Sequence, residues 1–427
     1  MKPTVDSIRR WVENSFALTT HRYLATTTQQ AQRAVNAHEA RIRGGQKCGQ
    51  TQLPTLVAKN APLRVGQLST VIYSEYRTML IQENAPLAPL TTMKVGGPAR
   101  YFAEARNQDD VFQAVSFSRS RNLPLFVLGG GSNLIISDQG WPGLVLKIGI
   151  LGIEERDESG KSLFDVGAGE EWDRFVAKAV SRNGAGVECL SGIPGSVGGT
   201  PVQNVGAYGQ EVSETIESVM VFDTRDNQIR ELCNEACGFS YRTSIFNTSE
   251  RGRFIILRVT YALTRGGEPR VHYADLKKYF AGWKELPTLT ETREAVRQIR
   301  ASKGMLLSPG DEDCRSAGSF FKNPIVSARQ YEELSRRAAV KNLTIPSYPA
   351  LEAQRKVSAA WLVEHSGFSK GFGYGPAGIS RKHALAIVNR GQATAADVIS
   401  LKEQIQQRVE DIWGIRLEPE PVFVGFQ

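Results

Sequence analysis

The sequence has few of the features that mark membrane, secreted or metal-dependent proteins. Its 427 residues include no apolar run near the ~18 residues that a transmembrane helix needs. The five cysteines are odd in number and scattered, which favours free thiols in a reducing cytosol over a disulfide framework. The five histidines form no His-Glu-x-x-His motif and no cluster with cysteine, so we expect no metal centre. The remaining composition is that of an ordinary globular chain, long enough for two or three domains.

The net charge of +8 belongs almost entirely to the first 78 residues. They carry eleven Lys and Arg against four Asp and Glu, whereas the rest of the chain carries 41 basic and 40 acidic residues. The body of the protein is therefore near neutral, and we expect no nucleic-acid partner.

Residues 1–78 also differ in composition, being rich in Gln, Thr, Arg and Ala, and a helix is predicted over Thr27–Arg43. No secretory signal is recognisable in this segment. Three interpretations stay open: a loosely ordered extension, the product of an upstream start codon, and a targeting or docking arm. Met79 would serve as a natural start.

From about Asn84 the pattern becomes a mixture of short strands and helices, and a third compositional block begins near Ser308. Strands are predicted at Ala99–Ala105, Leu125–Leu128, Leu144–Ile148, Leu163–Val166, Val219–Phe222, Phe254–Leu263 and Ala384–Asn389, with an extended run at 416–425. Helices are predicted at Asp109–Arg121, Trp172–Asn183, Glu291–Lys303, Ala328–Asn342, Ala353–Ser366 and Thr394–Trp413.

Two glycine-rich loops predict a phosphate-bearing cofactor. The first, residues 129–133 (Gly-Gly-Gly-Ser-Asn), follows a predicted strand and lets successive backbone amides face an anion. The second, residues 190–209, is rich in glycine and holds two prolines, and its hydroxyls, amides and the Asn204 side chain offer donors to phosphates and a polar heterocycle. Neither loop matches a Walker loop or a dinucleotide fingerprint. The alternative for each is a turn-rich connection in a β-containing domain.

The segment 315–324 (Arg-Ser-Ala-Gly-Ser-Phe-Phe-Lys-Asn-Pro) presents one hydroxyl, that of Ser319, beside two aromatic residues that can exclude water. No histidine or acid lies close in sequence to make Ser319 a nucleophile, and no Gly-x-Ser-x-Gly elbow is present. A hydroxyl in a partly dry pocket still donates its proton to a strong base such as a carbanion, so Ser319 is a candidate general acid. The alternative is a tight turn capped by a buried aromatic pair.

Two further segments carry ionic candidates. Arg242 stands between aromatic and apolar residues, so we expect it to be partly buried and to need an anion, which a structural salt bridge would also supply. Glu418 and Glu420 lie two apart in an extended run, which sends them to opposite faces, so that one can point inward while the other is solvated. Two exposed surface acids are the alternative.

Together these motifs resemble bacterial UDP-N-acetylenolpyruvoylglucosamine reductases (MurB). The matching segments span about residues 84–427 and are 92–99 (Thr-Met-Lys-Val-Gly-Gly-Pro-Ala), 128–134, 191–209, 241–246, 317–324 and 417–422. The resemblance implies an α+β protein, with a two-subdomain FAD-binding fold of the vanillyl-alcohol-oxidase (PCMH) type plus a C-terminal α+β substrate-binding domain. Its expected parts are an N-terminal extension (1–78), FAD-binding subdomain 1 (79–150, joined by 414–427), FAD-binding subdomain 2 (151–307) and the substrate-binding domain (308–413).

The implied reaction is the NADPH-dependent reduction of the enolpyruvyl ether of UDP-N-acetylglucosamine enolpyruvate to the lactyl ether, UDP-N-acetylmuramate, in peptidoglycan precursor synthesis. By resemblance, Arg242 stabilises the developing enolate, Glu420 orients Arg242 or helps polarise the enol, and Ser319 protonates the α-carbon. Lys303, Asn323 and Tyr273 are implied to hold the diphosphate and uridine, with Tyr273 marking the subclass that closes a tyrosine-bearing loop over the substrate. The role of His383 stays open.

The resemblance also implies non-covalent FAD reduced by NADPH, and a cytoplasmic monomer without nucleic-acid or membrane partners. A carbohydrate or alcohol oxidase on the same flavin fold, and a non-catalytic nucleotide-sugar binding protein, are the alternatives. The residues expected to contact FAD are Gly129, Gly130, Gly131, Ser132, Asn133, Ser191, Gly192, Ile193, Pro194, Gly195, Val197, Gly198, Gly199, Asn204, Ala207, Tyr208 and Gly209.

Overall fold

The computed structural model describes residues 79–427 except 159, 309, 351–352 and 427. The helix predicted at Thr27–Arg43 and the three interpretations of residues 1–78 therefore lie outside the described residues. None of the helices in the described ranges is long and apolar enough to cross a membrane.

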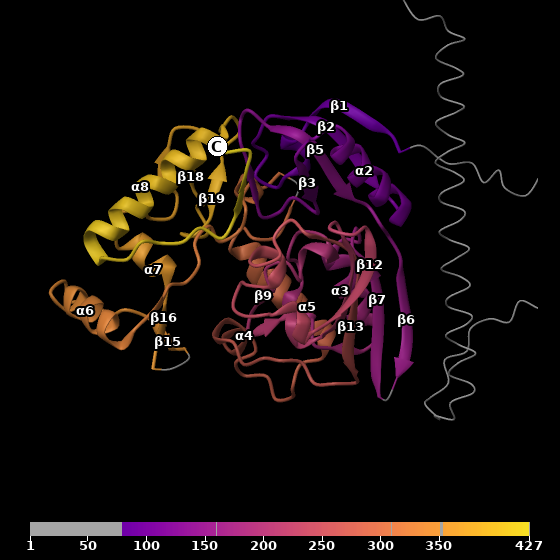
Figure 1. The fold of residues 1–427 in the computed structure, drawn as a ribbon. Helices are drawn as coiled ribbons and strands as arrows, with labels where there is room; N and C mark the ends of the chain where they lie inside the picture. The colour runs from indigo at the N-terminus through magenta and orange to yellow at the C-terminus, as the bar shows by residue number, and fades with distance from the viewer. Residues whose placement is uncertain (1–78, 159, 309, 351–352, 427) are drawn as a thin grey trace, which may run out of the picture. The chain divides into compact units, whose positions relative to one another are not determined.

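A four-stranded sheet opens the described chain, in the order β1-β2-β5-β3. Strand β1 runs antiparallel to β2, whereas β2 and β3 both run parallel to β5 (Figure 1). Helix α2 begins after Asn107, whose side chain accepts a hydrogen bond from Asp110 N, and it buries Val111, Ala114 and Val115 in the core beside this sheet. The bounds are β1 (Ile81–Pro86), β2 (Pro98–Ala105), α2 (Gln108–Ser120), β3 (Leu125–Leu128) and β5 (Trp141–Ile148).

The end of the chain returns to this first region. Strand β20 (Val422–Val424) pairs in parallel with β4 (Leu134–Ile136), which directly follows the first glycine-rich loop. Val424 is buried with Leu128, Ile136 and Val145, so the pairing is sealed by apolar packing. The hydrogen bond from Val422 N to Asn133 O, at 2.9 Å, extends the contact into the loop itself. The residues just before β20 are thereby held beside residues 129–133.

The second sheet has six strands, with β12-β11-β13-β7-β6 in order and β8 paired to β13. Helix α3 packs on it through Trp172 and Phe175, whose rings contact Tyr261 of β13 at centroid distances of 5.7 and 4.8 Å. Its elements are β6 (Ile153–Glu158), β7 (Lys161–Gly167), α3 (Trp172–Ser181), β8 (Gly184–Ala185), β11 (Ile216–Asp223), β12 (Gln228–Cys233) and β13 (Phe254–Arg265); the hairpin β9 (Gly206–Ala207) and β10 (Gln210–Glu211) and helices α4 (Ala274–Tyr279) and α5 (Leu289–Ser302) complete the region.

Among the described residues, the third region contains two three-stranded sheets and three helices. Its core includes Phe320, Leu362 and Trp413 and is continuous with Met93, Val95 and Ile135 of the first region. Its elements are β14 (Ile325–Val326), α6 (Ala328–Ala339), β15 (Ser347–Pro349), β16 (Arg355–Val357), α7 (Ala359–Glu364), β17 (Gly373–Tyr374), β18 (Ala377–Ile379), β19 (Ile387–Asn389) and α8 (Ala395–Trp413). Short 3-10 turns lie at Ala88–Leu90, Glu188–Leu190, Val197–Gly199, Val212–Glu214, Glu235–Cys237, Ile245–Asn247 and Glu312–Cys314.

The predicted helix Ala353–Ser366 is wrong in its first half. Residues Arg355–Val357 form β16, which pairs with both β14 and β15, and helix α7 begins only after Ser358. The Ser358 side chain accepts a hydrogen bond from Trp361 N and so marks the true helix start. Here long-range strand pairing outweighs local helix propensity.

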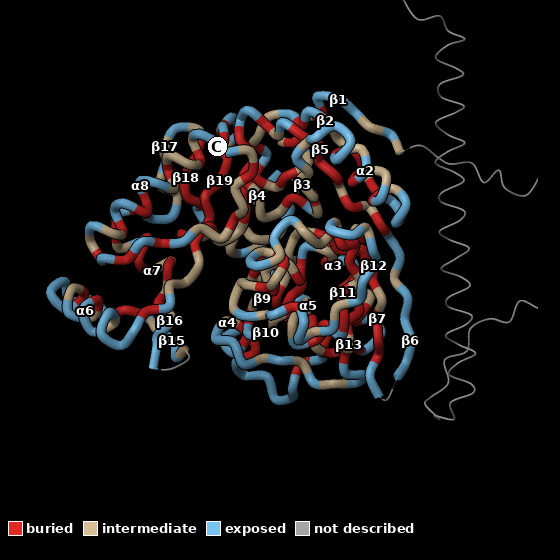
Figure 2. The backbone as a smooth tube through the Cα atoms, viewed as in Figure 1, coloured by how far each residue is buried: buried red, intermediate tan, exposed pale blue. Residues whose placement is uncertain are grey.

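The other helices and strands predicted within the described residues are confirmed within a few residues at their ends, except that the extended run at 416–425 forms a strand only at Val422–Val424. Several edge strands were not predicted. Strand β6 reads Ile-Glu-Glu-Arg-Asp-Glu and is almost wholly exposed, as its pale blue trace in Figure 2 shows. Such charged edges protect a sheet from pairing with other chains, and they also erase the apolar alternation by which a strand is recognised.

We predict that Val424→Ala lowers the free energy of unfolding by about 2 kcal/mol, because two methyl groups leave a fully packed core. Val422→Ala, on the same strand but only half-buried, should cost clearly less. Urea unfolding of both variants checks this, and equal losses would mean that β20 is not sealed by its buried face.

Candidate active site

Arg242 and Glu420 meet although 178 residues separate them in sequence. Arg242 Nε lies 3.1 Å from Glu420 Oε1, and both side chains are only 16% exposed. The anion that a partly buried arginine requires is therefore supplied by this carboxylate. The two charges therefore satisfy one another in a largely buried position.

Arg242 sits in an unusual backbone conformation. Ser240 and Thr243 exchange two hydrogen bonds of 3.0 Å, which closes a tight turn with Tyr241 and Arg242 at its tip. Arg242 has a φ of +57°, a left-handed conformation that costs a non-glycine residue about 1–2 kcal/mol. Its guanidinium is held in turn by Gly206 O, at 2.6 Å, and Asn204 O, at 3.4 Å. The surrounding loop thus fixes where the positive charge points.

Glu420 is placed by pairing with the segment that carries Ser319. Glu420 N donates to Phe320 O at 2.8 Å, and Pro419 forms a bridge with Phe321. Glu418 is 78% exposed, which confirms that the two carboxylates point to opposite faces. Burial raises the pKa of Glu420 above the usual value of a carboxyl, while nearby Arg242 and Lys322 oppose that rise.

Ser319 directly precedes Phe320, whose carbonyl accepts the hydrogen bond from Glu420 N. Ser319 therefore lies beside the backbone of Glu420. Phe320 and Phe321 are 0% and 2% exposed, as the paired aromatics predicted, and Ser319 itself is half-buried. Phe320 N also donates to Leu385 O at 2.8 Å, which ties the segment to the third region. The structure therefore brings the segments of all three predicted catalytic residues to one place.

Lys356 is a member of this site that was not predicted. Its ammonium nitrogen lies 3.9 Å from the centre of the Tyr241 ring, whose other cationic neighbour is Arg242 at 5.2 Å. Burial, assisted by Arg242, lowers the pKa of Lys356, and Glu211 opposes this. The sequence held no signal for it, because residue 356 fell in a stretch predicted to be helical.

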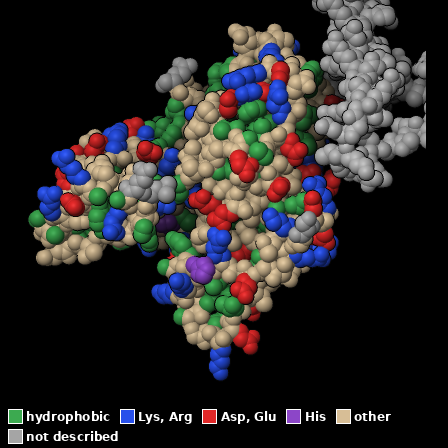
Figure 3. Space-filling view, turned by 60° about the horizontal axis from the view of Figure 1, so that its bottom comes forward, with side chains coloured by type: hydrophobic (Ala, Val, Ile, Leu, Met, Phe, Trp, Pro, Cys, Tyr) green, Lys and Arg blue, Asp and Glu red, His purple; other side chains and the backbone are tan. Residues whose placement is uncertain are grey.

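Figure 3 shows a hollow between the lobe on its left and the main body.

Several positive charges act on His383. Burial lowers its pKa to about 4, and the positive charges of Lys303, Lys370 and Arg300 act in the same direction. The imidazole is therefore neutral at pH 7.

The predicted substrate residues make the following contacts with the rest of the protein. Lys303 Nζ binds Asp275 at 2.5 Å and lies over the Tyr208 ring. Tyr273 is 44% exposed and meets Tyr208 edge to face, with ring centroids 5.5 Å apart. Asn323 has its side-chain oxygen bonded to Ala359 N at 2.9 Å.

The first glycine-rich loop forms a cradle for an anion. None of the described residues accepts a hydrogen bond from the backbone N–H groups of residues 129–133, while the carbonyls of 131–133 brace Thr92 and Val422. A Cβ on Gly130 would lie 2.5 Å from Gly195 Cα, so the two glycine-rich loops touch through their backbones. The buried hydroxyl of Ser196 finds no partner among the described residues and lies against Gly129. Free amides and a free buried hydroxyl fit the phosphates and polar groups of FAD.

The second loop serves the cofactor site less directly than predicted. The Ser191 hydroxyl donates to Glu188 O at 2.6 Å, and Gly192 uses its N–H on Asp173 and its carbonyl on Arg300. The N–H groups of Val197, Gly198 and Gly199 likewise bond to protein carbonyls. Of the remaining predicted residues, Ile193, Pro194, Gly195 and Ala207 are half-buried, Tyr208 is buried and Gly209 is exposed. Ser196, which was not predicted, carries the free donor instead.

Asn204 corrects a prediction. Its side chain was expected to offer donors to a cofactor, but it is 1% exposed and bonded to Glu211, Ser240 and Ser213 N. Asn133 is similar in part, since its side-chain amide donates to Gln203 Oε1 and to Glu420 O while its backbone N–H stays free. A polar side chain in a loop can face either inward or outward, and the sequence does not say which.

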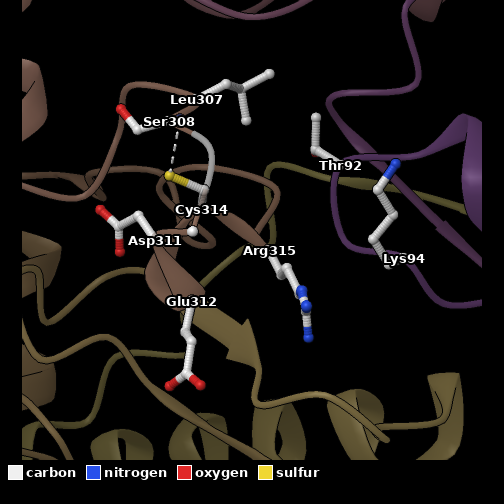
Figure 4. A pocket seen from close by; sticks show the side chains of 9 residues that line it. Thr92, Lys94, Leu307, Ser308, Asp311, Glu312, Cys314 and Arg315 are labelled. Carbon is white, nitrogen blue, oxygen red and sulfur yellow. Dashed lines mark hydrogen bonds between the residues drawn. The ribbon is translucent and has the colours of Figure 1, made fainter.

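A cavity of about 440 Å³ lies next to the first loop. Figure 4 shows Thr92 and Lys94 on one side of it and Leu307, Ser308, Asp311, Glu312, Cys314 and Arg315 on the other. The Thr92 hydroxyl bonds to Ser316 O at 2.6 Å and approaches Ser132 O at 3.3 Å. Thr92 thus connects the cradle to the segment that carries Ser319.

Comparison with known proteins agrees with this geometry. Residues 309–424 match the family model for the C-terminal domain of UDP-N-acetylenolpyruvoylglucosamine reductase, and residues 99–232 match that for an FAD binding domain. The reductase of Thermobifida fusca is 44% identical over 356 residues, covering 82% of this chain and 99% of that protein. The reductase of Streptomyces coelicolor is 44% identical over 349 residues, covering 80% and 90%. The crystal structure of the Thermus caldophilus reductase matches with a TM-score of 0.56 and 27% identity, covering 81% of this chain and 99% of that chain.

We predict that Gly130→Ala destabilises the cofactor-free protein by about 1–3 kcal/mol, because the added methyl group meets backbone atoms that cannot move aside. Gly129→Ala is the matched control, since its methyl group would meet only the Ser196 hydroxyl, which can rotate. Thermal unfolding of both variants tests this, and an equally stable Gly130→Ala protein would show that the loops are not in backbone contact.

Proposed function

The chain belongs to the UDP-N-acetylenolpyruvoylglucosamine reductase family, and from that premise we propose which residues carry out its reaction. It is an FAD-dependent oxidoreductase that uses NADPH to reduce the enolpyruvyl ether of UDP-N-acetylglucosamine enolpyruvate to the lactyl ether, a step of peptidoglycan precursor synthesis. The oxidase alternative is less supported, because the curated relatives carry the reductase name. The observation that carries the residue assignment is the Arg242–Glu420 pair beside the Ser319 segment.

The amides of residues 129–133 and the Ser196 hydroxyl, which are free of partners among the described residues, would hold FAD. When bound, it supplies the two-electron reduction of the enolpyruvyl methylene carbon. The protein must then stabilise negative charge on the neighbouring carbon and carboxylate of the substrate, and deliver one proton to that carbon.

Arg242 stabilises the developing negative charge. Its guanidinium is preorganised by Glu420 and two backbone carbonyls, so it needs no reorganisation when charge appears. It acts where charge grows, which lowers the energy of the transition state more than that of bound substrate. Glu420 orients the guanidinium and keeps it from turning toward other acceptors.

Ser319 donates the proton to the α-carbon of the substrate. An unassisted hydroxyl is a weak acid, so it reacts only with a strongly basic carbon, and Phe320 and Phe321 limit competition from water. The stereochemistry of the lactyl ether follows from the face on which Ser319 stands.

The diphosphate of the substrate binds at Lys303, with Tyr273 and Asn323 beside it. The neutral imidazole of His383 adds a hydrogen-bonding group there without a further charge. Tyr273, on an exposed loop next to Tyr208, is placed to cover the bound nucleotide sugar, as in the tyrosine-loop subclass.

Three broader assignments belong to the same proposal. The protein acts in the cytosol as a monomer, and the free thiols of Cys189, Cys233, Cys237 and Cys314 suit a reducing compartment. Its functional parts follow the predicted boundaries of 79–150 with 414–427, 151–307 and 308–413, which the separate sheets support.

Ser319→Ala should leave flavin reduction by NADPH nearly intact but slow reoxidation by the enolpyruvyl substrate by ~10²–10⁴-fold, the usual contribution of a general acid. Anaerobic stopped-flow absorbance resolves the two half-reactions separately in the variant and the native protein. A proportional loss in both would remove Ser319 from the role of proton donor.

Arg242→Lys should slow the same oxidative half-reaction by at least ~10²-fold, because an ammonium cannot hold a carboxylate at two points as a guanidinium does. Arg258→Lys is the control, since Arg258 is equally exposed, at 16%, and pairs with Asp165 outside the site. Near-normal turnover of Arg242→Lys would refute the charge-stabilising role.

A further inference from the structure

The side-chain carboxamide of Asn204 makes all of its hydrogen bonds to other groups of the protein. Its nitrogen donates to Glu211 Oε2 at 2.7 Å and to Ser240 O at 3.1 Å, and its oxygen accepts from Ser213 N at 3.1 Å. Asn204 itself has a φ of +47°, so the loop bends sharply at this residue. A fully bonded, buried amide at a bend fixes the relative position of the three segments that it joins.

One of those segments is the turn that carries Arg242. Ser240 O, which accepts from the Asn204 side chain, lies two residues before Arg242, and the Asn204 carbonyl accepts from Arg242 Nη1. The same residue therefore contacts both the base of the turn and the guanidinium at its tip.

Gly206 and Glu211 complete the support. Gly206 O accepts from Arg242 Nη2, and a Cβ on Gly206 would lie 2.8 Å from Glu211 Cγ and 3.1 Å from Arg242 Nη1. Glu211 thus packs against the backbone that holds the guanidinium, while its carboxylate is directed at Asn204. No side chain fits between the arginine and its support.

We propose that Asn204 is a positioning residue for the reaction: through Ser240 and its own carbonyl it holds the Arg242 guanidinium against Glu420. This inference rests on the proposed function of Arg242. It replaces the expectation that Asn204 donates to the cofactor.

Asn204→Asp tests the proposal with almost no change in volume. A carboxylate still accepts from Ser213 N, but it cannot donate to Ser240 O or Glu211, and it offers the guanidinium a competing anion. We expect flavin content, the visible spectrum and the rate of reduction by NADPH to stay within about threefold of the native protein, and the oxidative half-reaction to slow by about 30-fold or more.

The pH dependence of the oxidative half-reaction gives a readout that general loosening of the loop would not move. The charged or titratable groups that act on Glu420 are Arg242 from the turn, Lys322 from the Ser319 segment and the adjacent Tyr241. Burial raises the pKa of Glu420, and the positive charge of Arg242 opposes that rise. When Arg242 moves away, the pKa of Glu420 should rise further. The limb of the pH profile that reports ionisation of Glu420 should therefore move to higher pH.

Asn234→Asp is the matched control. Asn234 also donates two amide hydrogen bonds to backbone carbonyls nearby, those of Ser213 and Ile216, but has none to the turn of Arg242. It should keep both half-reactions and the native pH profile. If Asn204→Asp does not fold, Asn204→Ala, which adds no charge, takes its place in the same comparison.

The proposal is overturned if the Asn204 variant loses flavin, if both half-reactions fall together, or if the oxidative step and its pH profile are native. An impaired Arg242→Lys beside a native Asn204→Asp would overturn only the positioning role. Normal turnover in Arg242→Lys would instead remove the proposed function on which it rests.

Discussion

The contact between Arg242 and Glu420 is the constraint on which the rest of the site depends. A guanidinium and a carboxylate that are both largely buried must satisfy one another or remain costly charges. Their pairing requires that a strained turn in the second region, the segment before β20 and the segment of Ser319 all reach one point. The turn is secured by Asn204 and Gly206, the segment before β20 by β4, and the Ser319 segment by Leu385, while the last two segments also bond to each other.

The strain at Arg242 has a plain use. A left-handed arginine is unfavourable on its own, so the turn persists only because its neighbours over-determine it. The same neighbours fix the direction in which the guanidinium points. Electrostatic stabilisation is most effective when the stabilising group is already in place. The hydrogen bonds formed around Arg242 on folding offset the strain of its backbone and hold its positive charge in one direction.

The first glycine-rich loop, residues 129–133, is likewise fixed by contacts with a distant segment. Gly130 and Gly195 touch through their backbones, and the amides of residues 129–133 have no acceptor among the described residues. The glycine content of the two loops predicted such a cradle. The division of labour between them was not predictable, because most donors of the second loop are used to build the loop itself, and the one free hydroxyl is that of Ser196.

The sequence alone determined the chemistry that is available: a hydroxyl between aromatics, an arginine in apolar surroundings, two carboxylates of alternating direction, and the segments that resemble a reductase family. It also determined most helices and buried strands, because apolar periodicity and capping residues act over a few neighbours. Only the tertiary structure decided that residues 355–357 form a strand, that Lys356 lies over the Tyr241 ring, and that the Asn204 side chain bonds to Glu211 and Ser240. These outcomes depend on pairing and burial between segments far apart in the chain, and the free energy of such contacts is not encoded in any local stretch of residues.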